Sequence, residues 1–434
     1  MSIAWRPQIC AAAFLFVAQS LALSLFLTSQ AAWGAPDPKG FAAEDSAGEF
    51  VVTLSAGCVL TSFRLPELAP VSTFDGGECD VAAIAPAADG RSLFVATRDA
   101  TVLSLAVPHL RVKARSQQNL VASELLAAAS GPYLIIVDTK SRQLHIVNRD
   151  TLALLRTVAL RDRREQPLTF VRMLESRSRR SVLIAFAESE LWEMFLAPDA
   201  EPVFEGLVHD YRMGEGLREQ HILPIRRIAL DGPIDSLSLE PGSAYLIATR
   251  RASDGNARLL RFNLDVRRVV AERRIARMPE ALAVVTLAGS LGRKLLVADL
   301  EGLRAYGLPG LVPESDIGLT GDGCRIAAAN EARWVALWAC RGGESGRIFI
   351  VDMLTHSLKS VLQPFGDVMP GDVVPGDAVR GDVVPDEVIA RRPEGSLWIA
   401  AYGAAGAIIR YRSGDWCRAS ELAFPGLKRA WFYP

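Results

Sequence analysis

Residues Tyr133–Asn148 read YLIIVDTKSRQLHIVN, two apolar runs of strand length separated by a short polar turn. An apolar run bounded by turn residues is typical of a β-strand that is buried on both faces. The same arrangement recurs along the chain, in copies that begin at Phe50, Ser92, Val182, Ala244, Lys294, Trp334 and Ser396. This recurrence indicates a repeated unit, and each unit is a small antiparallel sheet.

Eight such units lie between Glu49 and Leu422, each with an apolar strand, a turn, a second strand, a turn and a third strand. Sheet-forming repeats of this length are the signature of a β-propeller. The sequence therefore predicts an all-β, eight-bladed β-propeller over residues 35–434. The first unit is short of one strand, and we expect the tail Leu427–Phe432 to supply it, so that N- and C-terminal strands close the ring.

The N-terminal 34 residues carry the three parts of a secretory signal. A basic residue, Arg6, precedes an apolar stretch from Ile9 to Leu27, and small residues follow as far as Gly34. We therefore expect residues 1–34 to be a signal peptide and the mature protein to be periplasmic, with no stable membrane span after cleavage. An uncleaved anchor is the alternative, because the apolar stretch is nearly long enough to cross a bilayer.

The charges of the chain are balanced. Lysine and arginine total 48 and aspartate and glutamate total 49, which gives a net charge of −1. No basic block is long enough to indicate a nucleic-acid-binding segment. Nucleic acid is therefore excluded as an expected partner.

Cysteine usage leaves the disulfide pairing open. Five cysteines follow the signal, an odd number in a compartment that permits disulfides: Cys58, Cys79, Cys324, Cys340 and Cys417. Cys324 and Cys340 flank one predicted hairpin and are candidates for a cross-strand pair, and Cys58 could reach Cys79 or Cys417. Buried free thiols are the alternative. No Cys-x-x-Cys-His motif occurs, so a covalently attached c-type haem is excluded.

Two stretches interrupt the repeat. The first is Glu205–Pro233, a long connection rich in charge, glycine and aromatic residues, and it is the leading site candidate because long loops on a rigid scaffold carry function. The second is Gly366–Pro385, in which a five-residue Gly-Asp unit occurs four times. Calcium repeats place oxygen ligands more densely than one aspartate in five residues, so we interpret this segment as a loop lengthened by tandem duplication.

Motifs for catalysis are missing from the sequence. It contains no Gly-x-Ser-x-Gly elbow, phosphate-binding loop, dinucleotide fingerprint or His-Glu-x-x-His pair, and we expect no catalytic residues. His145 alternates with apolar residues and is predicted to lie on a strand, whereas His109 and His356 fall in turns. Only His209 and His221 share a loop, and their spacing is not that of a helical zinc pair.

One part of the sequence resembles a known family. The string GLVHDYRMGEG at Gly206–Gly216 is followed by RRIALD at Arg226–Asp231, by NLDVRR at Asn263–Arg268 and by Met278–Pro279. In content and order these pieces resemble the eight-bladed d1-haem propeller of the cytochrome cd1 nitrite reductases and their stand-alone propeller relatives, which include accessory proteins of haem d1 biosynthesis. The close match covers residues 200–280.

The resemblance implies a haem d1 held at the central face of the propeller. It places the following residues at or beside that face: His209, Asp210, Tyr211, Arg212, Glu215, Arg226 and Arg227. His209 would serve as an iron ligand or proton donor, and the arginines would bind the haem carboxylates. A loop that only plugs the ring, with His209 and Asp210 hydrogen-bonded to each other, is the alternative.

The sequence also departs from this family. Met278–Pro279 is followed by Glu280 where relatives have a histidine, and the family's Lys-Tyr-Asn ending is replaced by Pro425–Trp431. With no attached electron-entry haem either, a self-contained nitrite reductase is not expected. The resemblance instead implies a non-catalytic accessory protein in haem d1 maturation or nitrite-reductase assembly, with a tetrapyrrole and a periplasmic cytochrome or nitrite reductase as partners. A propeller that binds no haem and serves as a protein interaction module is the alternative, and an enzyme acting on a tetrapyrrole is a third reading.

Overall fold

The structure is a computed structural model, and it describes residues 49–433 except 56–58, 66, 76–80, 198, 200–202, 206–216, 219–221, 253, 287–291, 300–301, 319–321, 329–333, 342–347, 363–396, 402–406, 412–417 and 424–426. The chain divides into two units, Met1–Gly48 and Glu49–Pro434. All described residues belong to the second unit. The signal predicted for residues 1–34 and the Gly-Asp repeat Gly366–Pro385 lie outside the described residues.

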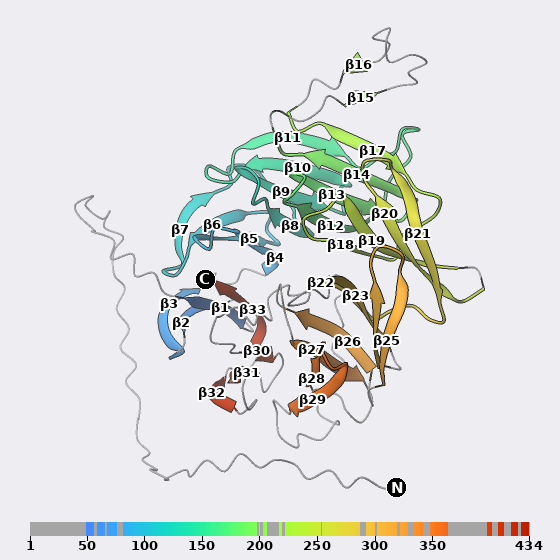
Figure 1. Ribbon diagram of the computed structural model, residues 1–434. Helices are drawn as coiled ribbons and strands as arrows, with labels where there is room; N and C mark the ends of the chain where they lie inside the picture. Colours follow the sequence, from blue (N-terminus) through green and yellow to red (C-terminus); the bar gives the residue numbers. More distant parts are fainter. Residues whose placement is uncertain are drawn as a thin grey trace, which may run out of the picture. The chain divides into compact units, whose positions relative to one another are not determined.

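Every element in the described part of the chain is a β-strand (Figure 1). The first three sheets contain β1 (Phe50–Ser55), β2 (Val59–Arg64), β3 (Ala69–Asp75) and β33 (Leu427–Tyr433); β4 (Val81–Pro86), β5 (Ser92–Thr97), β6 (Val102–Ala106) and β7 (Arg111–Arg115); β8 (Glu124–Ala127), β9 (Tyr133–Asp138), β10 (Gln143–Asn148) and β11 (Leu154–Ala159). The next sheets contain β12 (Phe170–Ser176), β13 (Ser181–Phe186), β14 (Glu190–Phe195) and β17 (Ile225–Ala229); β18 (Ser236–Leu239), β19 (Tyr245–Arg251), β20 (Ala257–Asn263) and β21 (Arg268–Ile275).

The remaining sheets contain β22 (Ala281–Thr286), β23 (Arg293–Asp299), β24 (Gly302–Gly307) and β25 (Val312–Gly318); β26 (Asp322–Ala328), β27 (Trp334–Arg341), β28 (Ile348–Asp352) and β29 (Ser357–Leu362); β30 (Leu397–Ala401), β31 (Ala407–Tyr411) and β32 (Arg418–Ala423). A separate hairpin pairs β15 (Phe204–Glu205) with β16 (Leu217–Arg218). The pairings within each sheet are antiparallel, so the all-β prediction is confirmed.

The unit predicted from the sequence was one strand short. Six of the sheets begin with a strand that the pattern did not reveal, such as β8 or β18, each of which has only four residues. The apolar runs quoted from these units therefore occupy the two central positions of a four-stranded sheet, as β9 and β10 do in the order β11-β10-β9-β8. In these six sheets the first quoted run is therefore the second strand of its sheet.

Consecutive sheets pack against each other through shared apolar clusters. In β9, Leu134 and Ile136 belong to the cluster shared with the β4–β7 sheet, whereas Ile135 and Val137 belong to the cluster shared with the β12–β17 sheet. Successive side chains of a strand point to opposite faces, so a strand between two sheets must be apolar at every position. This is why the sequence shows continuous apolar runs. Burying each such side chain contributes about 1.5–3 kcal/mol.

The turn before the last strand of several sheets has a recurring conformation. Leu110, Leu152 and Leu311 have φ angles of 50°, 57° and 55°, in the left-handed region, and their side chains are buried. A left-handed conformation costs a residue with a Cβ about 1–2 kcal/mol. Burial of the leucine side chain offsets that cost.

The first sheet joins the two ends of the described chain. β33 pairs antiparallel with β1, and Thr53 faces Ala430 in the register. Both residues are buried. The pairing predicted for the C-terminal tail is therefore present.

Candidate functional site

Most of the predicted haem-contacting residues lie outside the described part of the chain. These are His209, Asp210, Tyr211, Arg212 and Glu215. Arg226 and Arg227 are described, and both lie on β17, the edge strand of the β12–β17 sheet. The interpretation of Glu205–Pro233 as one long loop was therefore wrong for residues 225–229. These residues complete a sheet because Ile225 and Ile228 are buried against it.

The two arginines on β17 point to opposite faces of the sheet. In the register Arg226 faces Glu193 and Arg227 faces Trp192, which are neighbours on β14. The Arg227 guanidinium lies 5.0 Å from the centroid of the Trp192 ring. Neighbouring residues of a strand alternate between its faces. Arg226 and Arg227 therefore cannot bind one ligand from the same side, and their predicted role at a haem stays a prediction.

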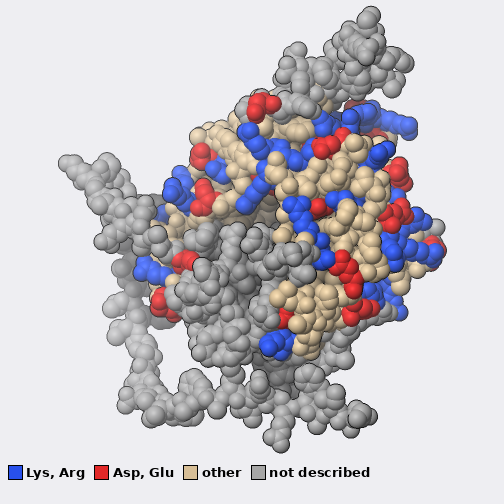
Figure 2. Space-filling view, in the orientation of Figure 1, with Lys and Arg blue, Asp and Glu red and all other residues tan. Residues whose placement is uncertain are grey.

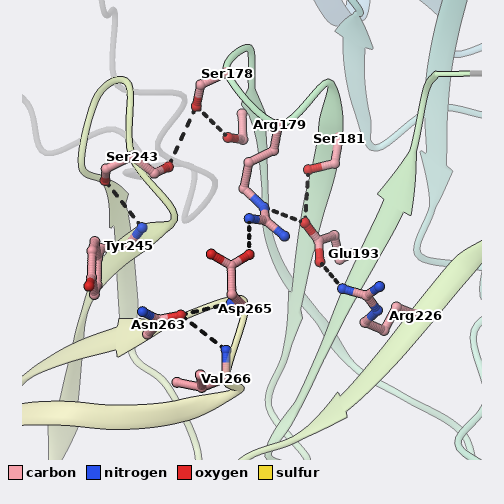
Figure 3. A network of polar contacts seen from close by, with 11 residues as sticks. Ser178, Arg179, Ser181, Glu193, Arg226, Ser243, Tyr245, Asn263, Asp265 and Val266 are labelled. Carbon is pink, nitrogen blue, oxygen red and sulfur yellow. Dashed lines mark hydrogen bonds and ion pairs between the residues drawn. The ribbon is translucent and has the colours of Figure 1, made fainter. Parts of the chain in front are cut away.

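Arg226 belongs to a polar network centred on Glu193 (Figure 3). Glu193 has no exposed side-chain surface. Its Oε1 accepts hydrogen bonds from Arg179 Nε at 2.7 Å and from Ser181 Oγ at 3.2 Å. Its Oε2 lies 3.5 Å from Arg226 Nη1, and the Arg226 guanidinium also lies 4.8 Å from the Phe195 ring centroid. The buried carboxylate is thus compensated by two guanidinium groups.

The same network links two sheets. Arg179 lies in the turn between β12 and β13, and its Nη1 donates to Asp265 Oδ1 at 2.5 Å in the turn between β20 and β21. Figure 3 shows the Arg179 guanidinium between the two carboxylates. Burial lowers the pKa of Arg179, but the hydrogen bonds from Arg179 to Glu193 and Asp265 more than offset this, so its pKa is raised. Arg179 is therefore a cation at neutral pH.

A second buried carboxylate repeats this arrangement one sheet later. Glu240 accepts from Arg261 Nε at 2.9 Å and from Arg293 Nη1 at 3.2 Å, and Arg293 belongs to the β22–β25 sheet. The Arg261 guanidinium lies 3.6 Å from the centroid of the Tyr245 ring. Both carboxylates are fully paired, which makes them structural links between sheets.

One titratable group that the sequence interpretation missed is Glu124, the first residue of β8. Its carboxylate accepts a hydrogen bond from the backbone N–H of Met173 on β12, the edge strand of the next sheet. Burial raises the pKa of Glu124 to about 7, although the nearby Arg172 and the Met173 hydrogen bond act in the opposite direction. Glu124 can therefore exchange a proton near neutral pH. The sequence contained one sign of this group, a glutamate at the start of the apolar strand ELLA.

The histidines that the structure describes do not form a metal site. His145 lies on β10 as predicted, its side chain is buried, and its Nδ1 is 3.2 Å from Thr157 Oγ1. His109 and His356 are exposed in turns, as predicted. Among the described residues no group of three His, Cys, Asp or Glu side chains is placed to hold a metal ion.

Two of the five cysteines lie on paired strands. Cys324 is on β26 and Cys340 on β27, and the register in this region passes from Gly323 opposite Ala339 to Arg325 opposite Trp338. Cys58, Cys79 and Cys417 lie outside the described residues. The two strands are paired, but the register gives neither cysteine a partner at these shifts, and the disulfide stays a prediction.

The described residues include no helix that is long and apolar enough to cross a membrane.

Comparison with known proteins identifies the fold. No protein family model matches the sequence, and no curated protein matches it significantly. Among solved structures, dihydro-haem d1 dehydrogenase NirN in complex with DHE matches with a TM-score of 0.68 and 17% sequence identity, over 92% of this chain and 77% of NirN. The chain therefore shares the fold of NirN. The resemblance inferred from Gly206–Gly216 and the following segments is thus confirmed at the level of the fold.

A second structure is more distant. BamB from Moraxella catarrhalis matches with a TM-score of 0.47 and 12% identity, over 85% of this chain and 89% of BamB. This similarity is too weak to support a functional inference.

Proposed function

We propose that this chain is a periplasmic, eight-bladed propeller, closed by its terminal strands, that binds haem d1 or a precursor of it. Its role is that of a non-catalytic accessory protein in haem d1 maturation or nitrite-reductase assembly. The carrying observation is the fold shared with NirN over 92% of the chain, because NirN was solved in complex with DHE. The pairing of β1 with β33 and the repeated four-stranded sheets support the closed eight-bladed arrangement.

Of the residues proposed to contact the haem, Arg226 and Arg227 are described, so their fit to a haem carboxylate can be compared. A haem d1 carries carboxylates, and a guanidinium group binds carboxylates in a bidentate manner. Arg226 Nη1 lies 3.5 Å from Glu193, which also has closer partners in Arg179 and Ser181. Glu193 would therefore keep compensating contacts if the Arg226 guanidinium turned to a ligand carboxylate. Arg226 fits this role better than Arg227, which lies over the buried Trp192 ring.

The iron ligand in this proposal is His209, and the bound haem would supply a coloured, redox-active iron. The deciding experiment is an absorption titration of the purified protein with haem d1 and with ordinary haem. We expect a saturable, red-shifted band for the wild type that His209→Ala weakens at least about tenfold in affinity, since an axial ligand is lost. His356→Ala, which removes an exposed turn histidine, is the matched control and should leave the titration unchanged.

Two other outcomes would change the assignment. A flat titration with both haems would overturn the proposal and leave a protein interaction module as the function. Conversion of a haem d1 precursor by the protein alone, followed in the same spectra, would show an enzyme instead of an accessory protein.

A further inference from the structure

One sheet carries a concentration of basic residues that the balanced charge of the whole chain conceals. Residues 250–277 contain nine arginines and three carboxylates, whereas the complete chain has a net charge of −1. This segment forms β19 in part, β20 and β21. Figure 2 shows basic side chains gathered on the side of the molecule where Figure 1 places β20 and β21. The excess charge is therefore local to one sheet.

The three carboxylates of this segment each form an ion pair with an arginine. Asp265 pairs with Arg179, Glu272 with Arg258, and Asp254 Oδ2 lies 2.8 Å from Arg274 Nη2. Six arginines of the segment have no ion pair with a described carboxylate, and we name them the arginine edge: Arg250, Arg251, Arg267, Arg268, Arg273 and Arg277. All of these except Arg250 are exposed. The arginine edge thus carries positive charge that no described carboxylate pairs.

A small cavity of about 110 Å³ opens beside this edge. Its walls include the apolar side chains of Ile234, Leu260 and Phe262, and its lining also includes Arg267 and Arg268. Arg250 and Asp231 complete the polar part of the lining, where the Arg250 guanidinium donates to the carbonyl oxygens of Gly232 and Pro233. An apolar cavity beside unpaired arginines favours a ligand with one apolar group, which enters the cavity, and with anionic groups on either side, which contact the arginines.

The strand that carries the edge can also pair with a further strand. β21 is the last strand of the order β18-β19-β20-β21, so the backbone groups on its outer side have no strand partner in the described sheet. Val266, in the turn before β21, and Val270, on β21, are exposed, with 54% and 43% of their surface accessible. An extended peptide added to such an edge gains backbone hydrogen bonds, and its side chains reach neighbouring pockets.

We propose that the arginine edge and its cavity bind an acidic, extended polypeptide segment that places one apolar side chain in the cavity. Charge complementarity selects the acidic segment, and the cavity selects the apolar side chain. Single-stranded nucleic acid is disfavoured because it requires exposed aromatic rings for stacking, and the one aromatic residue in residues 250–277, Phe262, is buried. A membrane surface is disfavoured because the exposed apolar residues here are two valines.

The test uses a fluorescent nine-residue peptide with a central leucine flanked on each side by four glutamates. Binding is measured by fluorescence anisotropy at low and at high salt, on the full-length protein without tetrapyrrole. Arg267→Glu combined with Arg268→Glu should weaken binding about tenfold, because two attractive charges become repulsive. Arg163→Glu with Arg164→Glu, which reverses two exposed arginines in the connection between β11 and β12, is the matched control and should change binding less than about twofold.

Two further variants test the cavity separately from the charge. Ala229→Phe places a ring in the cavity lining at an exposed position, and replacing the peptide's leucine by alanine removes the anchor. Each should weaken binding about fivefold, as loss of a partly buried apolar side chain does. Urea unfolding of each variant verifies that the fold is retained.

Three results would each overturn the proposal. In the first, the arginine-edge variant binds the peptide as tightly as the wild type, and in the second the control variant loses as much affinity as the arginine-edge variant. In the third, an oligothymidylate or phosphatidylglycerol vesicles compete with the peptide and bind equally well. The last result would reveal a general polyanion surface. The experiment contains no tetrapyrrole, so its failure is separate from any failure of the proposed haem binding.

Discussion

Arg179 and Glu193 form a buried ion pair in which Arg179 Nε lies 2.7 Å from Glu193 Oε1. Glu193 is completely buried, and 15% of the Arg179 side chain is exposed. Arg179 also reaches Asp265 in the following sheet. Between the two sheets, the Arg179–Asp265 contact and the hydrogen bond from Ser178 Oγ to the Ser243 carbonyl oxygen accompany a shared apolar cluster.

Removing Arg179 should destabilise the protein strongly. Arg179→Ala leaves Glu193 buried with Ser181 and the more distant Arg226 as partners, and breaking a buried pair from one side costs about 3–5 kcal/mol. The free energy of unfolding, measured in urea, should fall by about that amount. The double variant Arg179→Met with Glu193→Gln should recover part of the loss, because the buried carboxylate charge that has lost its closest guanidinium partner is removed as well.

The neighbouring arginine provides the control for this prediction. Arg180 pairs with Asp199 at 3.3 Å, and the two side chains are 49% and 78% exposed. Arg180→Ala should therefore cost less than about 1 kcal/mol. Equal losses for Arg179→Ala and Arg180→Ala would contradict the assigned role of the buried pair.

Glu124 should make stability depend on pH. The pKa of Glu124 is raised from 4.5 to about 7 by burial, so between these values the folded protein holds this proton more firmly than the unfolded chain. The contribution is fully present below about pH 4.5 and is lost as the pH rises through 7, at most about 3 kcal/mol. Glu124→Gln should remove this part of the pH dependence in urea unfolding from pH 4.5 to 8.

The control for Glu124 is Glu165→Gln. The Glu165 side chain is 79% exposed, and its substitution should leave the pH profile unchanged. If Glu124→Gln kept the wild-type profile, the carboxylate would be ionised in the folded protein throughout this range.

His145 should lower the stability of the fold as the pH falls, whereas Glu124 lowers it as the pH rises. Burial lowers the pKa of His145 from 6.5, and the nearby Asp138 only partly opposes this. The unfolded chain then binds the proton more readily, so stability should fall as the pH drops below 6.5 toward the folded-state pKa. His145→Gln should flatten this acid limb, with His356→Gln as the exposed control. An unchanged acid limb in the His145 variant would show that other groups produce it.

Ala100 tests the cost of a left-handed turn residue. It lies between β5 and β6 with a φ of 63°, a conformation that glycine adopts without strain. Ala100→Gly should raise the free energy of unfolding by about 0.5–1 kcal/mol after the entropy cost of glycine is subtracted. Ala129→Gly is the matched control at a turn position without a positive φ, and it should lower stability. Thermal or urea unfolding distinguishes the two signs.

The apolar periodicity of the sequence was sufficient to predict the central strands of the sheets. Runs such as the one beginning at Tyr133 are apolar at successive positions because both faces of β9 are covered. The residues of such a strand therefore show the burial without any knowledge of the fold. The edge strands carry a weaker signal. β8 has four residues and begins with a glutamate, so a local pattern could not separate it from a turn.

The candidate site depended more on tertiary structure. The sequence grouped Arg226 with Arg227 as two carboxylate-binding groups, yet strand formation at β17 sends them to opposite faces. The partners Arg179 and Glu193 are fourteen residues apart, and Arg179 and Asp265 are eighty-six apart. Strand pairing within one sheet brings Arg179 to Glu193, and the packing of one sheet on the next brings Arg179 to Asp265.

The sequence by itself determined that the chain is a repeat of antiparallel sheets, because burial on both faces demands continuous apolar strands. It also carried the family resemblance, which the shared fold with NirN bears out. Tertiary structure alone decided which charges are buried and paired, which pKa values move, and where arginines are left uncompensated beside a cavity. These properties depend on distances between residues far apart in the chain, and no local pattern contains such distances.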